Sequence, residues 1–274
     1  MLSGIMSFIE KYIVEPFKYA TSDLDKIIIG GMLLFFNSIV DSLLPSLEGS
    51  PTYGQILGVC LLIFIITLIL NGVVLGYYIG VIKNTLKGLD ILPDWSNIVE
   101  LLTDGILYSI ALLLLVLMLL IPVGLLFMFI LALILVSENM SYYDPTVVVV
   151  VLIPLILLMI VLFIVLDIYE SLATVNFAKK GFFGFFEIRD ILKKISLEYL
   201  GIWFLYTLCN SLVSLIFKFS LQYSLYVNDW ILLCLVILIV SPITFIPSVM
   251  FYRAVAKYYL EREGKIYIER NKVN

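Results

Sequence analysis

The chain has 274 residues, of which 62% are hydrophobic and 14% are charged, and its formal net charge is −4. A water-soluble domain usually contains about 45–50% apolar and about 25% charged residues, so this composition excludes an ordinary soluble globular protein. The sequence has no histidine, which removes the commonest general base and the commonest metal ligand. It also has no basic run of the kind that binds nucleic acid.

The first 26 residues predict an amphipathic helix. Apolar residues follow helical spacing from Leu2 to Phe17, and charged residues occupy the opposite side. These charges recur every few positions and leave no central apolar core, so we do not expect a cleavable signal sequence. Segment 1–26 is expected to lie in the plane of the membrane interface.

Six apolar runs are long enough to cross a bilayer as helices, because a hydrocarbon core of about 30 Å requires about 20 helical residues. They predict an all-α fold, a polytopic membrane helix bundle of about six transmembrane helices in three hairpins. The third run is the longest and contains Pro122, where the helix is expected to tilt or kink. The predicted spans are 27–45, 54–82, 105–136, 147–168, 199–217 and 230–252.

The charges of the loops predict the orientation. With six spans, all but one of the 17 Lys and Arg residues share a side with both termini, and Lys218 is the exception. Basic loops stay in the cytoplasm, so both termini are predicted to be cytoplasmic in a multi-pass protein of the cell membrane. A turn at Pro122 would add a seventh span and move the five cations of loop 176–198 outside, so six spans are favoured. Residues 1–274 then form a single membrane domain that ends in a charged cytoplasmic tail, 253–274.

Two further amphipathic segments precede the third and fifth spans. Residues 98–104 follow Trp95, a residue type that collects in the headgroup layer. In residues 185–195 the spacing of Asp190 and Lys194 predicts an i,i+4 ion pair. Each of the three hairpins is therefore expected to follow a cytoplasmic interfacial amphipathic helix.

Four short sequences, taken in order, resemble a known family. They are FKYATSDLDKIIIGG (17–31), GYYIGVIKNTLKGLDILPDW followed by DG (within 76–105), NFAKKGFFGFFEIRDIL (176–192) and FYRAVAKYYLE (251–261). Their order resembles the family catalogued as domain of unknown function 4013, multi-pass membrane proteins of archaea and some bacteria, with many copies in methanogens. In the most specific stretch, 76–105, Lys83 occupies the family's usual arginine-like exit position. The family has no established activity, so the resemblance implies the architecture and no site residues.

Glycines of the second span predict a face for helix packing. Small residues four positions apart allow helix backbones to approach closely. We expect the partner of this face to be another helix of the chain, and a second copy is the alternative. The glycines are Gly54, Gly58, Gly72, Gly76 and Gly80.

Three polar residues within the predicted spans are candidates for a functional role, namely Asn71, Asp167 and Asn210. Polar groups in a membrane are costly, and function is the default hypothesis for them. The structural alternative is that the asparagines bridge helices and that Asp167 reaches water at a membrane edge. The sequence predicts no catalytic, cofactor-binding or metal-binding residues.

Signatures of enzymes, such as a phosphate-binding loop or a nucleophile elbow, are absent from the sequence. The sequence therefore favours a non-enzymatic module that organises lipid or a membrane partner protein. Its expected partners are the lipid bilayer and a membrane protein or a second copy of the chain. A component of a small-solute or ion permease is the alternative, since prolines interrupt three spans. A lipid-processing enzyme is a third hypothesis, based on the loop acids Asp90, Asp94, Glu100 and Asp104.

Overall fold

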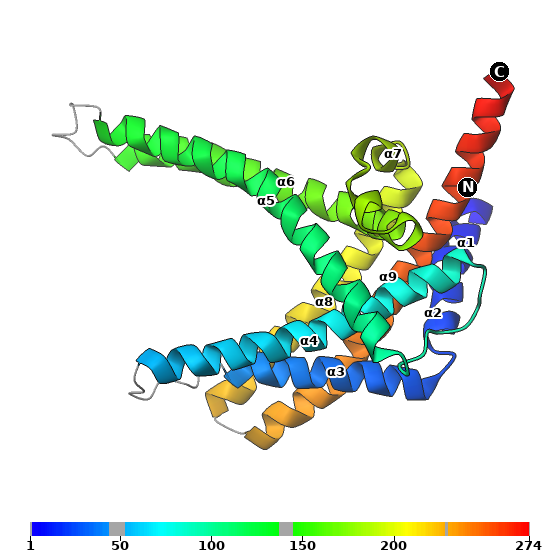
Figure 1. The fold of residues 1–274 in the computed structure, drawn as a ribbon, viewed down its shortest axis with the longest axis horizontal. Coiled ribbons are helices and arrows are strands. Elements are labelled where there is room, and N and C mark those ends of the chain that lie inside the picture. The colour runs from blue at the N-terminus through cyan, green and yellow to red at the C-terminus, as the bar shows by residue number, and fades with distance from the viewer. Residues whose placement is uncertain (1, 44–52, 137–144, 228–229, 274) are drawn as a thin grey trace.

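A computed structural model describes residues 2–43, 53–136, 145–227 and 230–273, and every regular element in these ranges is helical. The long helices form a bundle (Figure 1). They are α3 (Leu24–Leu43), α4 (Tyr53–Leu86), α5 (Ile98–Val136), α6 (Pro145–Lys180), α8 (Leu197–Val227) and α9 (Trp230–Val273). The short helices are α1 (Leu2–Ile9), the π-helical η1 (Glu10–Val14), α2 (Glu15–Ala20), the 3-10 helix η3 (Phe182–Phe186) and α7 (Ile188–Leu192).

Five of the long helices, α4, α5, α6, α8 and α9, are long and apolar enough to cross a membrane. The prediction of an all-α, polytopic membrane bundle is therefore confirmed. The predicted span 27–45 is covered by α3 up to Leu43, and its last residues lie outside the described ranges. The sixth span therefore stays a prediction.

The helices extend beyond the predicted spans at one end of the bundle. The fourth span was predicted to end at 168, but α6 continues to Lys180, and the predicted tail 253–274 is helical to Val273 as part of α9. Hydropathy indicates which residues suit the hydrocarbon core. A helix can continue beyond the end of its apolar run, because its backbone hydrogen bonds are internal. A true end of α6 is set by Gly181, whose φ of 81° favours glycine and whose N–H donates to the Phe177 carbonyl.

The second predicted amphipathic helix is not a separate element, because residues 98–104 are the first two turns of α5. Trp95 was expected in the headgroup layer, and its ring also packs on the bundle. Its ring stacks on Tyr77 with centroids 4.0 Å apart, and its Nε1 donates to the Lys26 carbonyl at 3.1 Å. The loop before α5 thus packs on the bundle, which satisfies the polar end of the indole.

The third amphipathic segment forms η3 and the short α7. The predicted pair of Asp190 and Lys194 side chains is replaced by a pair of Asp190 and Lys193, with 3.3 Å between Nζ and Oδ1. Lys194 instead places its Nζ 4.5 Å from the centre of the Tyr259 ring. An i,i+4 ion pair requires both residues to lie on one helix. Because α7 has only five residues and ends at Leu192, Lys194 lies beyond it.

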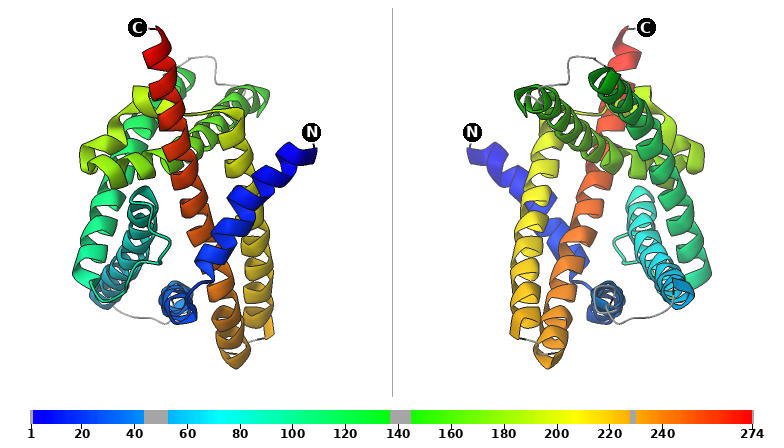
Figure 2. Two further views of the ribbon diagram at one scale, coloured as in Figure 1. Left: turned by 90° about the vertical axis from the view of Figure 1, so that its right-hand side faces the viewer. Right: turned by 90° about the vertical axis from the view of Figure 1, so that its left-hand side faces the viewer.

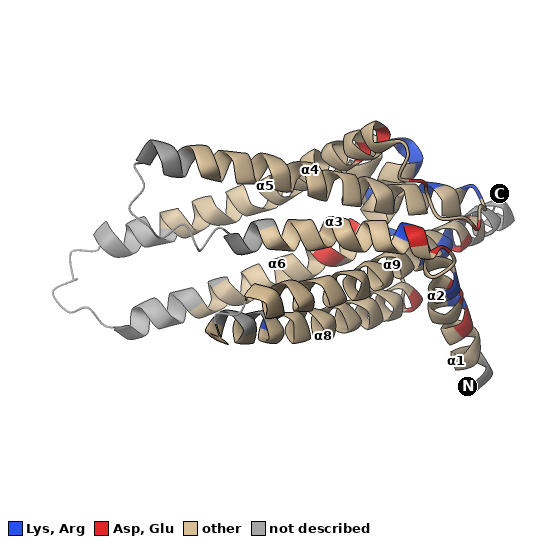
Figure 3. Cartoon of the chain, turned by 90° about the horizontal axis from the view of Figure 1, so that it is seen from below, with Lys and Arg blue, Asp and Glu red and all other residues tan. Residues whose placement is uncertain are grey.

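Charged residues gather at the end of the bundle that carries the N and C labels (Figure 3). We call this region the charged end. There α1 and α2 run across the helix ends rather than along them (Figure 3). In the middle of the bundle, α9 contacts α2, α3, α4, α6 and α8 (Figure 2). Away from the charged end the α5–α6 hairpin diverges from the other long helices (Figure 1).

Candidate functional site

A polar stripe runs along α8. Four of its members recur at steps of three and four residues, which places them on the same face of the helix, and the fifth is adjacent to one of them. The neighbouring positions Leu208, Leu212 and Ile216 are apolar and exposed, so the stripe interrupts a lipid-facing surface. The stripe consists of Thr207, Asn210, Ser211, Ser214 and Lys218.

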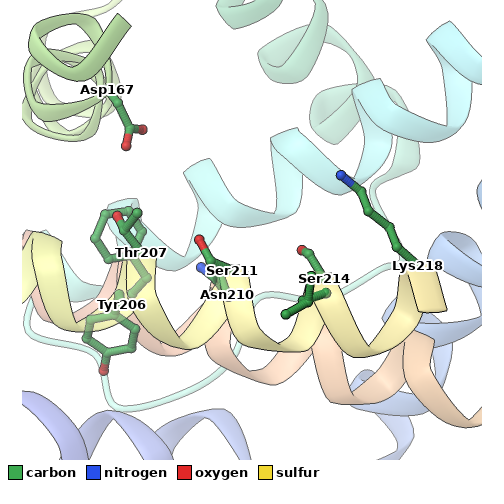
Figure 4. A pocket seen from close by; sticks show the side chains of 9 residues that line it. Asp167, Tyr206, Thr207, Asn210, Ser211, Ser214 and Lys218 are labelled. Carbon is green, nitrogen blue, oxygen red and sulfur yellow. The ribbon is translucent and has the colours of Figure 1, made fainter. Parts of the chain in front are cut away.

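This stripe forms one wall of a groove of about 400 Å³ between α6 and α8. Asp167 of α6 lies opposite, and Tyr206, Leu215 and Phe251 complete the lining. Figure 4 shows the side chains of Asp167, Ser211 and Lys218 extending toward the same space. Two of the residues predicted from the sequence, Asp167 and Asn210, are therefore brought together.

The carboxylate of Asp167 is held by one hydrogen bond, which Trp203 Nε1 donates at 2.9 Å. The side chain is exposed in the groove, and the described cations form no ion pair with it. The hydroxyl of Tyr206 points away from the groove and donates to the Tyr12 carbonyl at 2.7 Å. The third predicted polar residue, Asn71, lies half-buried on α4 and does not line the groove.

A second polar cluster lies one turn further along α6. The hydroxyl of Tyr108 donates to Glu170 Oε1 at 2.5 Å, and Thr174 Oγ1 donates to the Tyr108 hydroxyl at 3.2 Å. Tyr108 and Thr174 are fully buried. Glu170 was not predicted as a functional residue, because it lies two residues beyond the predicted end of the fourth span at 168. This cluster joins α5 to α6 and lies in the buried part of the bundle.

Arg253 is the central residue of the charged end. Its guanidinium is buried and donates to Glu15 Oε1 at 2.9 Å and to Asp90. It also donates to Thr85 Oγ1 at 3.1 Å and lies 4.3 Å from the centre of the Tyr19 ring. Burial raises the pKa of the Tyr19 phenol, so it remains neutral. Arg253 thereby connects α2, the end of α4 and α9.

Asn176 organises the turn between α6 and α7. Its amide donates to the Gly184 carbonyl at 2.6 Å and to Glu187 Oε2 at 3.1 Å, and it accepts from the Tyr259 hydroxyl at 2.6 Å. The hydrogen bond from Lys180, followed by that from Asn176, holds the pKa of Glu187 below its ordinary value. In the same region, burial lowers the pKa of the Lys194 ammonium.

The four loop acids that suggested an enzyme each have a partner of their own. The partner of Asp90 is Arg253, that of Asp94 is Lys26 at 2.7 Å, that of Asp104 is Lys83 at 2.5 Å, and that of Glu100 is the Asn97 amide at 2.6 Å. Three of them line a cavity of about 300 Å³ at the charged end. In this arrangement Asp90 and Asp94 fasten the loop 87–97 to α9 and α3, and Asp104 joins the start of α5 to α4.

The predicted glycine face lies against different surroundings along α4. A Cβ on Gly76 would lie 1.8 Å from the Leu101 carbonyl oxygen, and one on Gly80 would touch Pro93. Gly105 of α5 was not predicted to belong to this face. A Cβ added to Gly105 would lie 1.8 Å from the Gly72 carbonyl oxygen. A Cβ on Gly58 would meet nothing within 4 Å. The surroundings of Gly54 lie outside what the structure describes.

Comparisons with known proteins agree with this architecture. A family model described as "Protein of unknown function (DUF4013)" matches residues 59–221, more than half of the chain. The uncharacterized protein MJ1189 of Methanocaldococcus jannaschii is 32% identical, and the alignment covers 94% of this chain and 98% of that protein. The uncharacterized protein MJ0233 of the same organism is 31% identical over 94% of this chain and 99% of its own length. No solved structure matches. The chain therefore belongs to the DUF4013 family of uncharacterised, multi-pass membrane proteins.

Proposed function

We propose that this protein is a non-enzymatic membrane module that organises lipid. The observation that carries the proposal is the packing of the bundle, which is tight at the charged end and open elsewhere. In the most apolar 18-residue stretch of each of the five long spans, between 11% and 28% of the residues are buried within the chain. The remaining apolar surface is suited to lipid, which is as apolar as leucine.

The N-terminal helices support the same function. Tyr12 and Tyr19 are buried against the bundle, whereas Ile5, Met6 and Phe17 are exposed. A helix that runs across the bundle end and exposes an apolar side is suited to the membrane interface. We infer that α1 and α2 lie on the bilayer surface. They would thereby determine how deeply the bundle sits in the membrane.

We infer that the charged end is cytoplasmic, with both termini on that side of the cell membrane. The support is the distribution of basic residues, since all but one of the 17 Lys and Arg residues belong to segments predicted on that side. The paired loop acids support a structural role for this end. A carboxylate that already holds a cation is less available as a general acid or base.

The proposed function can be tested by measuring lipid that stays bound during purification. The full chain would be extracted in a mild detergent, washed through several columns, and its lipid counted per protein by mass spectrometry. We expect several lipid molecules per chain, because the open apolar surfaces lack a protein partner. A closed helix bundle of similar length, treated identically, is the control. Retention no greater than that of the control would contradict the proposal.

A permease component is the second candidate, and the polar groove between α6 and α8 favours it. Flux of ions or small solutes through vesicles that contain the full chain would measure this activity. Flux above that of protein-free vesicles, abolished by Asn210→Leu, would support a permease over a lipid-organising module. We expect no such flux, because most of the residues that line the groove are exposed or half-buried on the side of the bundle.

A further inference from the structure

We propose that the groove between α6 and α8 binds the headgroup of an amino-phospholipid, with its ammonium at Asp167 and its phosphate at the polar stripe of α8. This assignment rests on the proposed function, because it names the class of lipid that the module holds. Two features of the groove support it, namely where the groove opens and which hydrogen-bonding groups line it.

The groove opens sideways, toward lipid. On α8, Leu208, Leu212 and Ile216 flank the polar stripe and are 49%, 52% and 63% exposed. On α6, Phe163 and Ile160, four and seven residues before Asp167, are also exposed. Polar groups that face hydrocarbon without a partner raise the free energy of the protein. A headgroup in the groove would supply partners while its acyl chains lie along these apolar side chains.

The lining separates donors from an acceptor. Asn210, Ser211, Ser214 and Lys218 can all donate hydrogen bonds, whereas a phosphate can only accept them. Asp167 can only accept, and an ammonium group can only donate. Since Trp203 occupies one acceptor position of Asp167, further positions on the carboxylate are available to the ammonium.

The order of these groups also favours a zwitterionic headgroup. Thr207 and Ser211 are one helical turn apart on α8 and line the same groove as Asp167, so one small headgroup there would meet both a carboxylate and hydroxyls. An acidic headgroup without an amine would place negative charge near Asp167 and lose this attraction.

A second copy of the chain fits the groove poorly. Two chains with the same orientation in a membrane are related by an axis along the membrane normal, which brings equivalent residues to the same depth. Asp167 would then face the partner's Asp167, and Lys218 would face the partner's Lys218. Like charges would meet at both levels, which opposes association through this face.

The test compares lipid classes bound by the full chain in vesicles of equal phosphatidylethanolamine and phosphatidylglycerol content. After extraction with mild detergent, the ratio of the two retained lipids is measured by mass spectrometry. We expect the wild type to favour phosphatidylethanolamine about tenfold, as for one charge-assisted interaction. Asp167→Asn keeps an acceptor for Trp203 and is expected to bring the ratio close to one. Asp167→Lys is expected to invert it.

Cys209→Ala is the matched control, since Cys209 is exposed on α8 and does not line the groove. It should leave the ratio unchanged, and helicity and elution volume show whether each variant is folded. An unchanged ratio in folded Asp167→Asn would overturn the headgroup assignment. Lipid retained without a class preference would overturn it and leave the proposed function standing, whereas no retained lipid would overturn both.

Discussion

The two halves of α4 lie in one continuous helix and are packed in opposite ways. Between Gly72 and Ile82, nine of the eleven residues are buried, whereas between Gly58 and Leu70 none is. The buried half contains glycines and tyrosines that contact α5, the loop 87–97 and α9. The exposed half consists mainly of leucine and isoleucine. Apolar residues gain little by leaving lipid, so close approach and hydrogen bonds, rather than hydrophobicity, determine where this bundle packs.

If the fold is held at the charged end, Arg253 is its most sensitive residue. Arg253→Ala removes the buried guanidinium that joins Glu15, Asp90 and Thr85, while Glu15 keeps its ion pair with Lys257. We expect a loss of about 3 kcal/mol of unfolding free energy. The measurement is unfolding of the purified chain by denaturant in detergent micelles. Lys218→Ala is the control, because Lys218 is exposed and lies at the end of α8 that is away from the charged end. It should change the unfolding free energy by less than about 0.5 kcal/mol. Equal stability of the two variants would contradict the comparison.

Glycine substitutions compare the two halves of one helix directly. Gly76→Ala forces its Cβ against the backbone of Leu101 at 1.8 Å, so α4 and α5 must move apart. We expect a loss of about 1–3 kcal/mol or more, measured by thermal unfolding in detergent. Gly58→Ala meets open space and should be neutral or stabilising, because alanine favours a helix over glycine. Equal destabilisation by both substitutions would show that the outer half is packed as well.

Two tryptophans at opposite ends provide a smaller contrast. Trp95→Leu removes the stacking on Tyr77 and the hydrogen bond to the Lys26 carbonyl, with an expected loss of about 1–2 kcal/mol. Trp230 begins α9 and is exposed, so Trp230→Leu should have little effect on unfolding in detergent. Intrinsic fluorescence reports the same difference, since quenching by a lipid-soluble agent should reach Trp230 and spare Trp95. Equal quenching of the two would place Trp95 in lipid.

The sequence predicted the helical membrane bundle because apolar run length is a local property. It also indicated Asp167 and Asn210 one by one. Their convergence across the groove was not predictable, because it depends on which helices become neighbours and at what depth. The polar stripe could have been found from the helical spacing of Thr207, Ser211 and Lys218. The packing of Trp95 on Tyr77 was not predictable, because an aromatic residue near a membrane edge has the same sequence pattern whether it meets headgroups or a neighbouring helix.

The smallest expected effect is a pH dependence at the charged end. The pKa of Glu187 is held below its ordinary value by hydrogen bonds from Lys180 and Asn176. Its stabilising contribution is therefore fully present above about pH 4.5 and is lost as pH falls through the lower pKa of the folded protein. Glu187→Gln should remove this part of the stability profile, and the difference between the variant and the wild type should shrink below pH 4. Unfolding measured in detergent from pH 3 to pH 6 tests this, with Glu100→Gln as a control. A constant difference across that range would show that the carboxylate charge of Glu187 does not stabilise the turn, and that the Asn176 hydrogen bonds to Gly184 and Tyr259 hold it alone.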